Sequence, residues 1–127
     1  MTEQTASPLS EILNVAVPVT DHDRAVRFYT ETLGFEIRRD STFGPGMRWV
    51  EVAPPGATTT VALAPAHGRA AGVDTGIRLR TQDAEKTHEQ LRAQGVDVDA
   101  DILRMPGVPP MFFFRDVDGN TFVAVEG

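Results

Sequence analysis

The chain has 127 residues, of which 41% are hydrophobic and 24% are charged, as in one soluble globular domain with one core. No apolar run approaches the roughly 20 residues of a membrane-spanning helix, so a membrane protein is not expected. The net charge of −6 opposes binding to nucleic acid. The chain has no cysteine, and residues 1–10 lack the features of a secretory signal. A flexible leader and a cytoplasmic location are therefore predicted.

The first half of the chain predicts the order β-α-β-β-β. Residues 12–19 alternate β-branched side chains and form a first strand, in which Pro18 leaves one side without a ladder donor. Thr20 or Asp21 then caps a helix, which Gly34 ends. Three further strands are predicted between glycine- and proline-containing turns: 35–43, 47–52 and 58–65.

The second half predicts the same order after a small, polar linker at residues 66–75. Residues 76–81 form a strand, and Asp83 caps a helix that runs to Gln94 and is ended by Gly95. Three extended segments follow: 96–103, 109–116 and 121–127.

The two halves are one motif used twice. Equivalent residues lie at a nearly constant spacing: 62 positions for Asp21 and Asp83, 61 for Gly34 and Gly95, and 63 for Gly56 and Gly119. The predicted fold is α+β, with βαβββ modules at 11–65 and 76–127. Each module leaves one face of its sheet bare, so the two sheets are expected to curl around a shared cavity, which is the natural ligand site.

The segments "VTDHDRAVRFYTETLGFE" and "FFFRDVDGNTFVAVE" and the duplicated unit resemble the vicinal oxygen chelate superfamily. That superfamily includes glyoxalase I, bleomycin-resistance proteins, fosfomycin-resistance enzymes and extradiol dioxygenases. The resemblance covers residues 11–127 and implies the glyoxalase/bleomycin-resistance fold. It also implies a homodimer, in which a site is sometimes shared between two chains.

The resemblance further implies where a metal-dependent member holds its ligands. The positions are occupied here by Asn14, Gly76 and Val123, with Thr60 as the repeat partner of Val123. A divalent ion that acts as a Lewis acid needs three or four imidazole or carboxylate ligands, so no metal and no cofactor are predicted. One alternative stays open, because a bulge after "DGN" would turn Glu126 inward.

Aromatic residues are the predicted walls of the cavity. The 63-residue spacing pairs Trp49 with Phe112 and Glu51 with Phe114, and residues two apart share a face of a strand. If that face is concave, Trp49, Phe112 and Phe114 line the cavity and Glu51 is a polar anchor.

If that face is ordinary core instead, Met111 and Phe113 point into the cavity. Arg78 and Arg80 follow Gly76 with a period of two and share its predicted concave face. An inward Arg78 would bind a carboxylate, phosphate or enolate oxygen, whereas strand-end arginines otherwise reach solvent.

The leading hypothesis is a metal-independent small-molecule binding protein that resembles the bleomycin-resistance branch. It would hold an apolar or aromatic ligand with polar contacts from Asn14, Glu51 and Arg78, and so sequester an antibiotic or a metabolite. The alternative is a metal-free isomerase, cyclase or lyase in which Glu51 is a general base, its pKa raised by burial, and Arg78 stabilises an enolate. A metal-dependent glyoxalase or dioxygenase is the third possibility. Whether the protein is an enzyme therefore stays open.

Overall fold

The computed structural model describes residues 6–68 and 70–127. Residues 1–5 of the expected leader and residue 69 of the expected linker lie outside the described residues. The first module contains β1 (Asn14–Val19), α1 (His22–Arg27), the π-helical turn η1 (Phe28–Thr32), β2 (Glu36–Thr42), β3 (Arg48–Ala53) and β4 (Thr60–Pro65). The second contains β5 (Asp74–Thr81), α2 (Ala84–Ala93), β6 (Asp97–Val98), β7 (Leu103–Met105), β8 (Val108–Arg115) and β9 (Thr121–Glu126).

The predicted helix boundaries are confirmed by their caps. The Asp21 side chain accepts a hydrogen bond from the backbone N–H of residue 24 at 3.2 Å, and Asp83 accepts one from that of residue 86 at 3.0 Å. Each aspartate thus satisfies a donor that a helix start leaves free. Gly34 and Gly95, which follow the helices, have φ of 75° and 82°, a conformation that glycine adopts at little cost.

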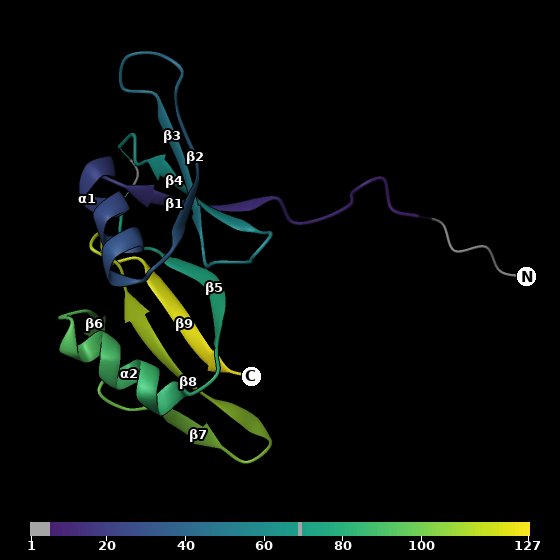
Figure 1. Ribbon diagram of the computed structural model, residues 1–127, viewed down its shortest axis with the longest axis vertical. Helices are drawn as coiled ribbons and strands as arrows, with labels where there is room; N and C mark the ends of the chain where they lie inside the picture. The colour runs from purple at the N-terminus through teal and green to yellow at the C-terminus, as the bar shows by residue number, and fades with distance from the viewer. Residues whose placement is uncertain (1–5, 69) are drawn as a thin grey trace, which may run out of the picture.

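The two modules form two mixed sheets, with strand orders β1-β4-β3-β2 and β5-β9-β8-β6. β1 is parallel to β4 and β5 is parallel to β9, while the other pairs are antiparallel. β1 is an edge strand, as Pro18 predicted. Figure 1 shows one sheet above the other, with α1 and α2 on the same side of the molecule. The predicted α+β fold is confirmed, and neither sheet closes into a barrel.

Both modules contribute to one hydrophobic core on the helix side of the sheets. The core includes Val17, Val19, Val50, Val52, Val61 and Leu63 from the first module and Phe112, Phe114, Phe122 and Ala124 from the second. Tyr29 of η1 is fully buried and joins the two sets, because its ring packs against Phe122 at a centroid distance of 6.1 Å. The face of each sheet opposite its helix is called its open face below.

A buried polar network links the modules at the turn between β8 and β9. The Tyr29 hydroxyl donates to Asp116 Oδ2 at 2.6 Å. The fully buried Asn120 donates from Nδ2 to the Pro18 carbonyl at 2.8 Å and to Asp116 Oδ2 at 3.0 Å. Its Oδ1 accepts from the backbone N–H groups of residues 72–73. One asparagine thus holds the end of β1, the linker and its own turn.

Two more contacts fix the start of α1 to the same turn. The Thr20 hydroxyl donates to Asp118 Oδ1 at 2.6 Å, and Arg24 donates to the carbonyl of Val117 at 2.7 Å. The position of α1 is therefore set by both modules. Across residues 6–68 and 70–127, no helix has the length and apolar character that crossing a membrane requires.

Candidate functional site

Three residues predicted for the ligand site lie on the open face of the first sheet. Val50 and Val52 of β3 point into the core, so Trp49 and Glu51 point the other way. Asn14 pairs with Thr60 across β1 and β4, and Glu51 is opposite Ala62 across β3 and β4. Asn14, Trp49, Glu51 and Thr60 thus share one surface.

The carboxylate of Glu51 is held there by two neutral donors. The indole Nε1–H of Trp49 donates to Glu51 Oε2 at 2.7 Å, and the Thr60 hydroxyl donates to Glu51 Oε1 at 2.7 Å. Trp49 and Glu51 are half-buried, and Thr60 is buried. These three residues, called the Glu51 cluster, fix both oxygens of one carboxylate in place.

These hydrogen bonds lower the pKa of Glu51 below its usual value. The Trp49 donor has the largest effect and the Thr60 donor the next, and together they outweigh the burial that raises it. The expectation of a raised Glu51 pKa is wrong for that reason. A general base works best with a pKa near the operating pH, so this carboxylate suits a permanent negative charge better than proton abstraction.

Arg39 adds a smaller attraction that also lowers the Glu51 pKa. It lies opposite Glu51 on β2, but its Nε donates to Ser41 Oγ at 3.3 Å and its guanidinium lies 5.7 Å from the centroid of the Phe43 ring. No salt bridge to Glu51 forms within the part of the chain that the structure describes. The carboxylate is oriented without being neutralised.

The open face of the second sheet carries Arg78 and Val123, which are neighbours in register. Phe113 is opposite Val123 on the next strand, and Arg78 Nη2 lies 3.9 Å from the sulfur of Met111. This surface therefore combines apolar side chains with the guanidinium of Arg78, and Arg80 lies two residues further along the same face of β5.

The expectation that Phe112 and Phe114 share the open faces with Trp49 is wrong. Phe112 meets His88 of α2 edge-on at a centroid distance of 5.0 Å, and Phe114 stacks on Phe122 at 5.5 Å. Both rings belong to the core on the helix side. The alternative pair, Met111 and Phe113, lies on the open face instead.

The error comes from one residue in a turn. Gly56 is the third residue after the end of β3, whereas Gly119 is the fourth residue after the end of β8. The 63-residue spacing of the turn glycines therefore does not hold for the preceding strands, where Val50 corresponds to Phe112 and Trp49 to Met111. Because side chains alternate along a strand, a shift of one position exchanges the two faces.

The residues at the expected metal positions do not fit a catalytic divalent ion. Asn14 offers a neutral oxygen, and the Thr60 hydroxyl already donates to Glu51. Gly76 and Val123 have no side-chain donor. Within the described residues, no three His, Asp or Glu side chains come together as a metal site requires. Glu126 does not turn inward, because its Oε1 accepts from the first backbone N–H of α2 at 2.9 Å.

A cavity of about 690 Å³ lies between the two modules, and we call it the junction cavity. Its apolar walls include Leu33, Phe35, Ile77, Leu79, Leu91 and Phe114. Thr60, Arg78 and Arg80 also line it, whereas Glu51 and Trp49 do not. The Glu51 cluster therefore adjoins the cavity only at Thr60. Its volume falls within the about 300–1,000 Å³ of typical small-molecule sites.

The structure therefore places some of the predicted site residues in the lining of the junction cavity and others next to it. Arg78, Phe114 and Thr60 line the junction cavity, and Trp49 and Glu51 adjoin it through Thr60. Sequence reasoning missed the walls contributed by the ends of the helices, such as Leu33 and Leu91. Both belong to apolar helical stripes, a signal that predicts core, so only the packing of the modules reveals the space beside them.

Comparison with known proteins gives the same family as the motifs. Residues 11–124 match the profile of the Glyoxalase/Bleomycin resistance protein/Dioxygenase superfamily. The protein YetH of Bacillus subtilis (strain 168) is 32% identical over 120 residues, which cover 93% of this chain and 99% of YetH.

Two solved structures are also similar. A member of the same superfamily from Sphaerobacter thermophilus DSM 20745 is 37% identical, with a TM-score of 0.89 over 94% of this chain and 98% of that one. TnmS3, an antibiotic binding protein from Streptomyces sp. CB03234, is 32% identical, with a TM-score of 0.83 over 95% and 98%. The chain therefore belongs to the glyoxalase/bleomycin resistance protein/dioxygenase superfamily, the vicinal oxygen chelate group that its motifs resemble.

Proposed function

We propose that this protein binds a small molecule with an apolar or aromatic body and does so without a metal. The observation that carries the proposal is the junction cavity of about 690 Å³, whose lining is mainly apolar with a few polar side chains. Apolar walls supply affinity by removing ligand surface from water, and sparse polar groups orient the ligand.

In this proposal Phe114 is an aromatic wall of the cavity, and Arg78 and Thr60 are polar contacts in its lining. Trp49 and Glu51 extend the site from Thr60 along the open face of the first sheet. Two further predicted residues lie next to these contacts. Asn14 is beside Thr60 on the open face of the first sheet, and Val123 is beside Arg78 on the open face of the second.

The similarity to TnmS3, an antibiotic binding protein, supports sequestration of an antibiotic or a metabolite. Sequestration needs no reactive group. The enzymatic alternatives gain no support from the site, since the pKa of Glu51 is lowered and the expected metal positions offer neutral oxygens or none. The absence of cysteine agrees with a cytoplasmic location, which remains a prediction.

A homodimer is part of the proposal. Leu9, Ile12 and Leu13, on the segment that projects from the molecule in Figure 1, are 82%, 70% and 69% exposed. Phe43 and Met47, at the tip of the β2–β3 hairpin, are 62% and 55% exposed. Clusters of large exposed apolar side chains of this kind mark interaction surfaces, and we infer that a second copy of the chain covers them.

Binding in the junction cavity can be tested with 1-naphthalenemethanol, a neutral aromatic probe. Its fluorescence changes when the probe leaves water for the protein, and the change is used to measure binding. Ala57→Trp places a large side chain at the wall of the cavity, and Ala93→Trp makes the same change at an exposed site on α2. We expect Ala57→Trp to weaken binding by about tenfold or more, because it removes the apolar contact area, while Ala93→Trp binds like the unchanged protein. Equal binding by all three proteins would contradict the proposal.

A further inference from the structure

We propose that the ligand carries a cationic nitrogen, which the carboxylate of Glu51 and the ring of Trp49 bind where the junction cavity meets Thr60. The inference rests on the proposed function and names the chemical class of its ligand: an organic cation with an apolar or aromatic body.

The first observation is the preorganised carboxylate. Each oxygen of Glu51 accepts one hydrogen bond, from Trp49 or from Thr60, at 2.7 Å. An ionised carboxylate has about four acceptor positions, so about half remain for a ligand. Because the side chain is already ordered, a ligand that binds it loses little affinity to ordering.

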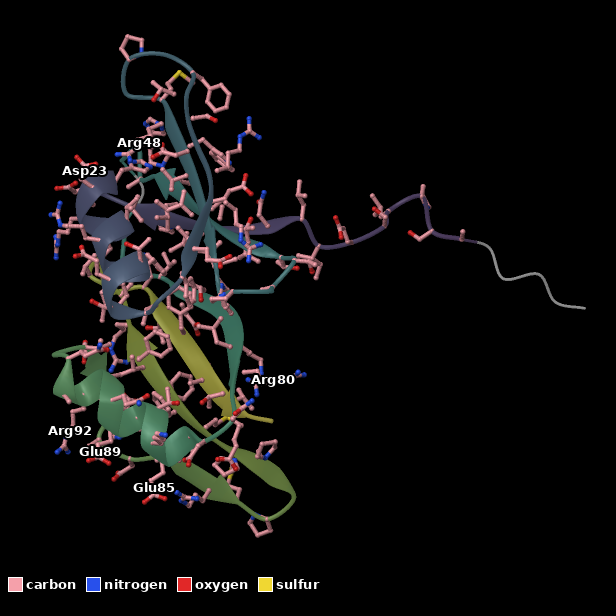
Figure 2. The ribbon with its side chains drawn as sticks, in the orientation of Figure 1. Asp23, Arg48, Arg80, Glu85, Glu89 and Arg92 are labelled. Atoms are coloured by element: carbon pink, nitrogen blue, oxygen red, sulfur yellow. The ribbon has the colours of Figure 1, made fainter. Side chains whose placement is uncertain are left out.

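The second observation is the uncompensated charge. The salt bridges of the described residues join other carboxylates to arginines, as in the Asp23–Arg48–Asp40 group that Figure 2 shows in part. Glu51 is half-buried, yet neutral groups hold it, and Arg39 is directed toward Ser41 and Phe43. Partial burial strengthens the field of such a charge. The electrostatic complement of this surface is a cation.

The third observation is the indole beside that carboxylate. The Nε1–H of Trp49 donates to Glu51 from the edge of the indole ring. This hydrogen bond does not use the two faces of the ring. The face of a tryptophan ring attracts ammonium groups, and aromatic side chains recognise quaternary ammonium ligands in this way. Carboxylate and indole together therefore favour a protonated or quaternary amine over a neutral or anionic group.

Two arginines of β5, Arg78 and Arg80, line the junction cavity on the side of the second module. Arg78 reaches toward the sulfur of Met111 on the second sheet, and Arg80 projects outward from β5 in Figure 2. Of the arginines, Arg39 is the one whose charge lowers the Glu51 pKa. Both guanidiniums that line the cavity, Arg78 and Arg80, come from the second module, whereas Glu51 lies beyond Thr60 on the open face of the first. A ligand that spans both modules would therefore place its nitrogen toward the first module.

Three probes with the same ring test the inference: 1-naphthylmethylamine, which is a cation at pH 7, neutral 1-naphthalenemethanol, and anionic 1-naphthoate. We expect the unchanged protein to bind the cation about tenfold more tightly than the alcohol, as a charged hydrogen bond allows, and the anion most weakly. In Glu51→Gln the amine and the alcohol should bind equally. The preference should also shrink as sodium chloride is added, because salt screens a partly exposed charge pair.

Matched variants separate the possible outcomes. Glu89→Gln removes the same charge from the outer face of α2 (Figure 2) and should keep the preference for the cation. Trp49→Phe, which loses the donor and keeps a ring, should reduce the preference without abolishing it. Equal binding of amine and alcohol by the unchanged protein, or a preference that survives Glu51→Gln, would overturn the inference and leave the proposed function standing. If no probe binds, or if Ala57→Trp does not weaken the binding of any of them, the proposed function fails and the inference fails with it.

Discussion

The Tyr29 hydroxyl donates a 2.6 Å hydrogen bond to Asp116 Oδ2, across 87 positions of sequence and across the boundary between the modules. Tyr29 is fully buried, and Asp116 is only 6% exposed. Asn120 donates to the same Asp116 oxygen and to the end of β1. The turn "DVDGN" therefore adds buried hydrogen bonds between the modules to the hydrophobic core that they share.

Tyr29→Phe should lower the free energy of unfolding by about 2 kcal/mol, because a buried carboxylate loses a hydrogen bond and keeps the ring packing. Urea denaturation at pH 7 measures the change. Thr20→Val removes a hydrogen bond to Asp118 at the exposed edge of the same turn and should cost less, about 0.5–1 kcal/mol. A larger cost for Thr20→Val than for Tyr29→Phe would show that the buried contact is not the principal link.

The same tyrosine should make the protein sensitive to alkali. Burial, and then the charge of Asp116, raise the pKa of Tyr29 well above its usual 10.0. Above pH 10 the unfolded chain loses this proton while the folded protein keeps it, so unfolding becomes easier as the pH rises. Urea denaturation between pH 8 and about pH 11 should show a decline that is smaller in Tyr29→Phe. Parallel curves for the two proteins would contradict this account.

Asn120→Ala should be more damaging than Tyr29→Phe, at about 3 kcal/mol or more, since it leaves several buried backbone and side-chain groups without partners. The other asparagine of the chain is a matched control, because Asn14 is half-buried on the open face. Asn14→Ala should cost less than about 1 kcal/mol. Thermal and urea denaturation of both variants measure the difference.

Glu51 should stabilise the fold at neutral pH and lose this effect in acid. Its pKa is lowered below the usual 4.5, so as the pH falls through and below that value the unfolded chain takes up the proton first. Thr60→Val removes one of the two donors and should shift the Glu51 pKa upward, which carbon-detected NMR titration of the carboxyl group measures directly. An unchanged Glu51 pKa in that variant would mean that the Thr60 hydroxyl does not bind the carboxylate in solution.

Light scattering coupled to size-exclusion chromatography tests the homodimer. The unchanged protein should have twice the mass of one chain, and Ile12→Glu with Leu13→Glu should shift it toward the monomer by placing charges in an apolar contact. Gln90→Glu, an exposed change on α2, should remain dimeric. A single-chain mass for the unchanged protein across the micromolar range would exclude the homodimer.

Much of the fold could be predicted because the sequence features that specify its helices and strands act over a few residues. Asp21 and Asp83 cap helices, and Gly34 and Gly95 end them, through contacts within a few residues of each position. The repeat then predicts the α+β duplication from spacing alone. The placement of Trp49 and Glu51 on one face follows from strand alternation. The network around Asn120 was not predicted, because its partners lie far away in the sequence.

By itself the sequence determined the order of elements, the duplicated module and the family, since each depends on short-range patterns or on motifs that can be read along the chain. Only the tertiary structure decided which faces meet. One extra residue between the end of β8 and Gly119 puts Phe112 in the core and Met111 on the open face, the reverse of what the glycine spacing predicts. Two donors brought together from β3 and β4 lower the Glu51 pKa that burial alone would have raised. Side-chain direction in a sheet and the charge state of a buried group both depend on neighbours that the folded chain supplies.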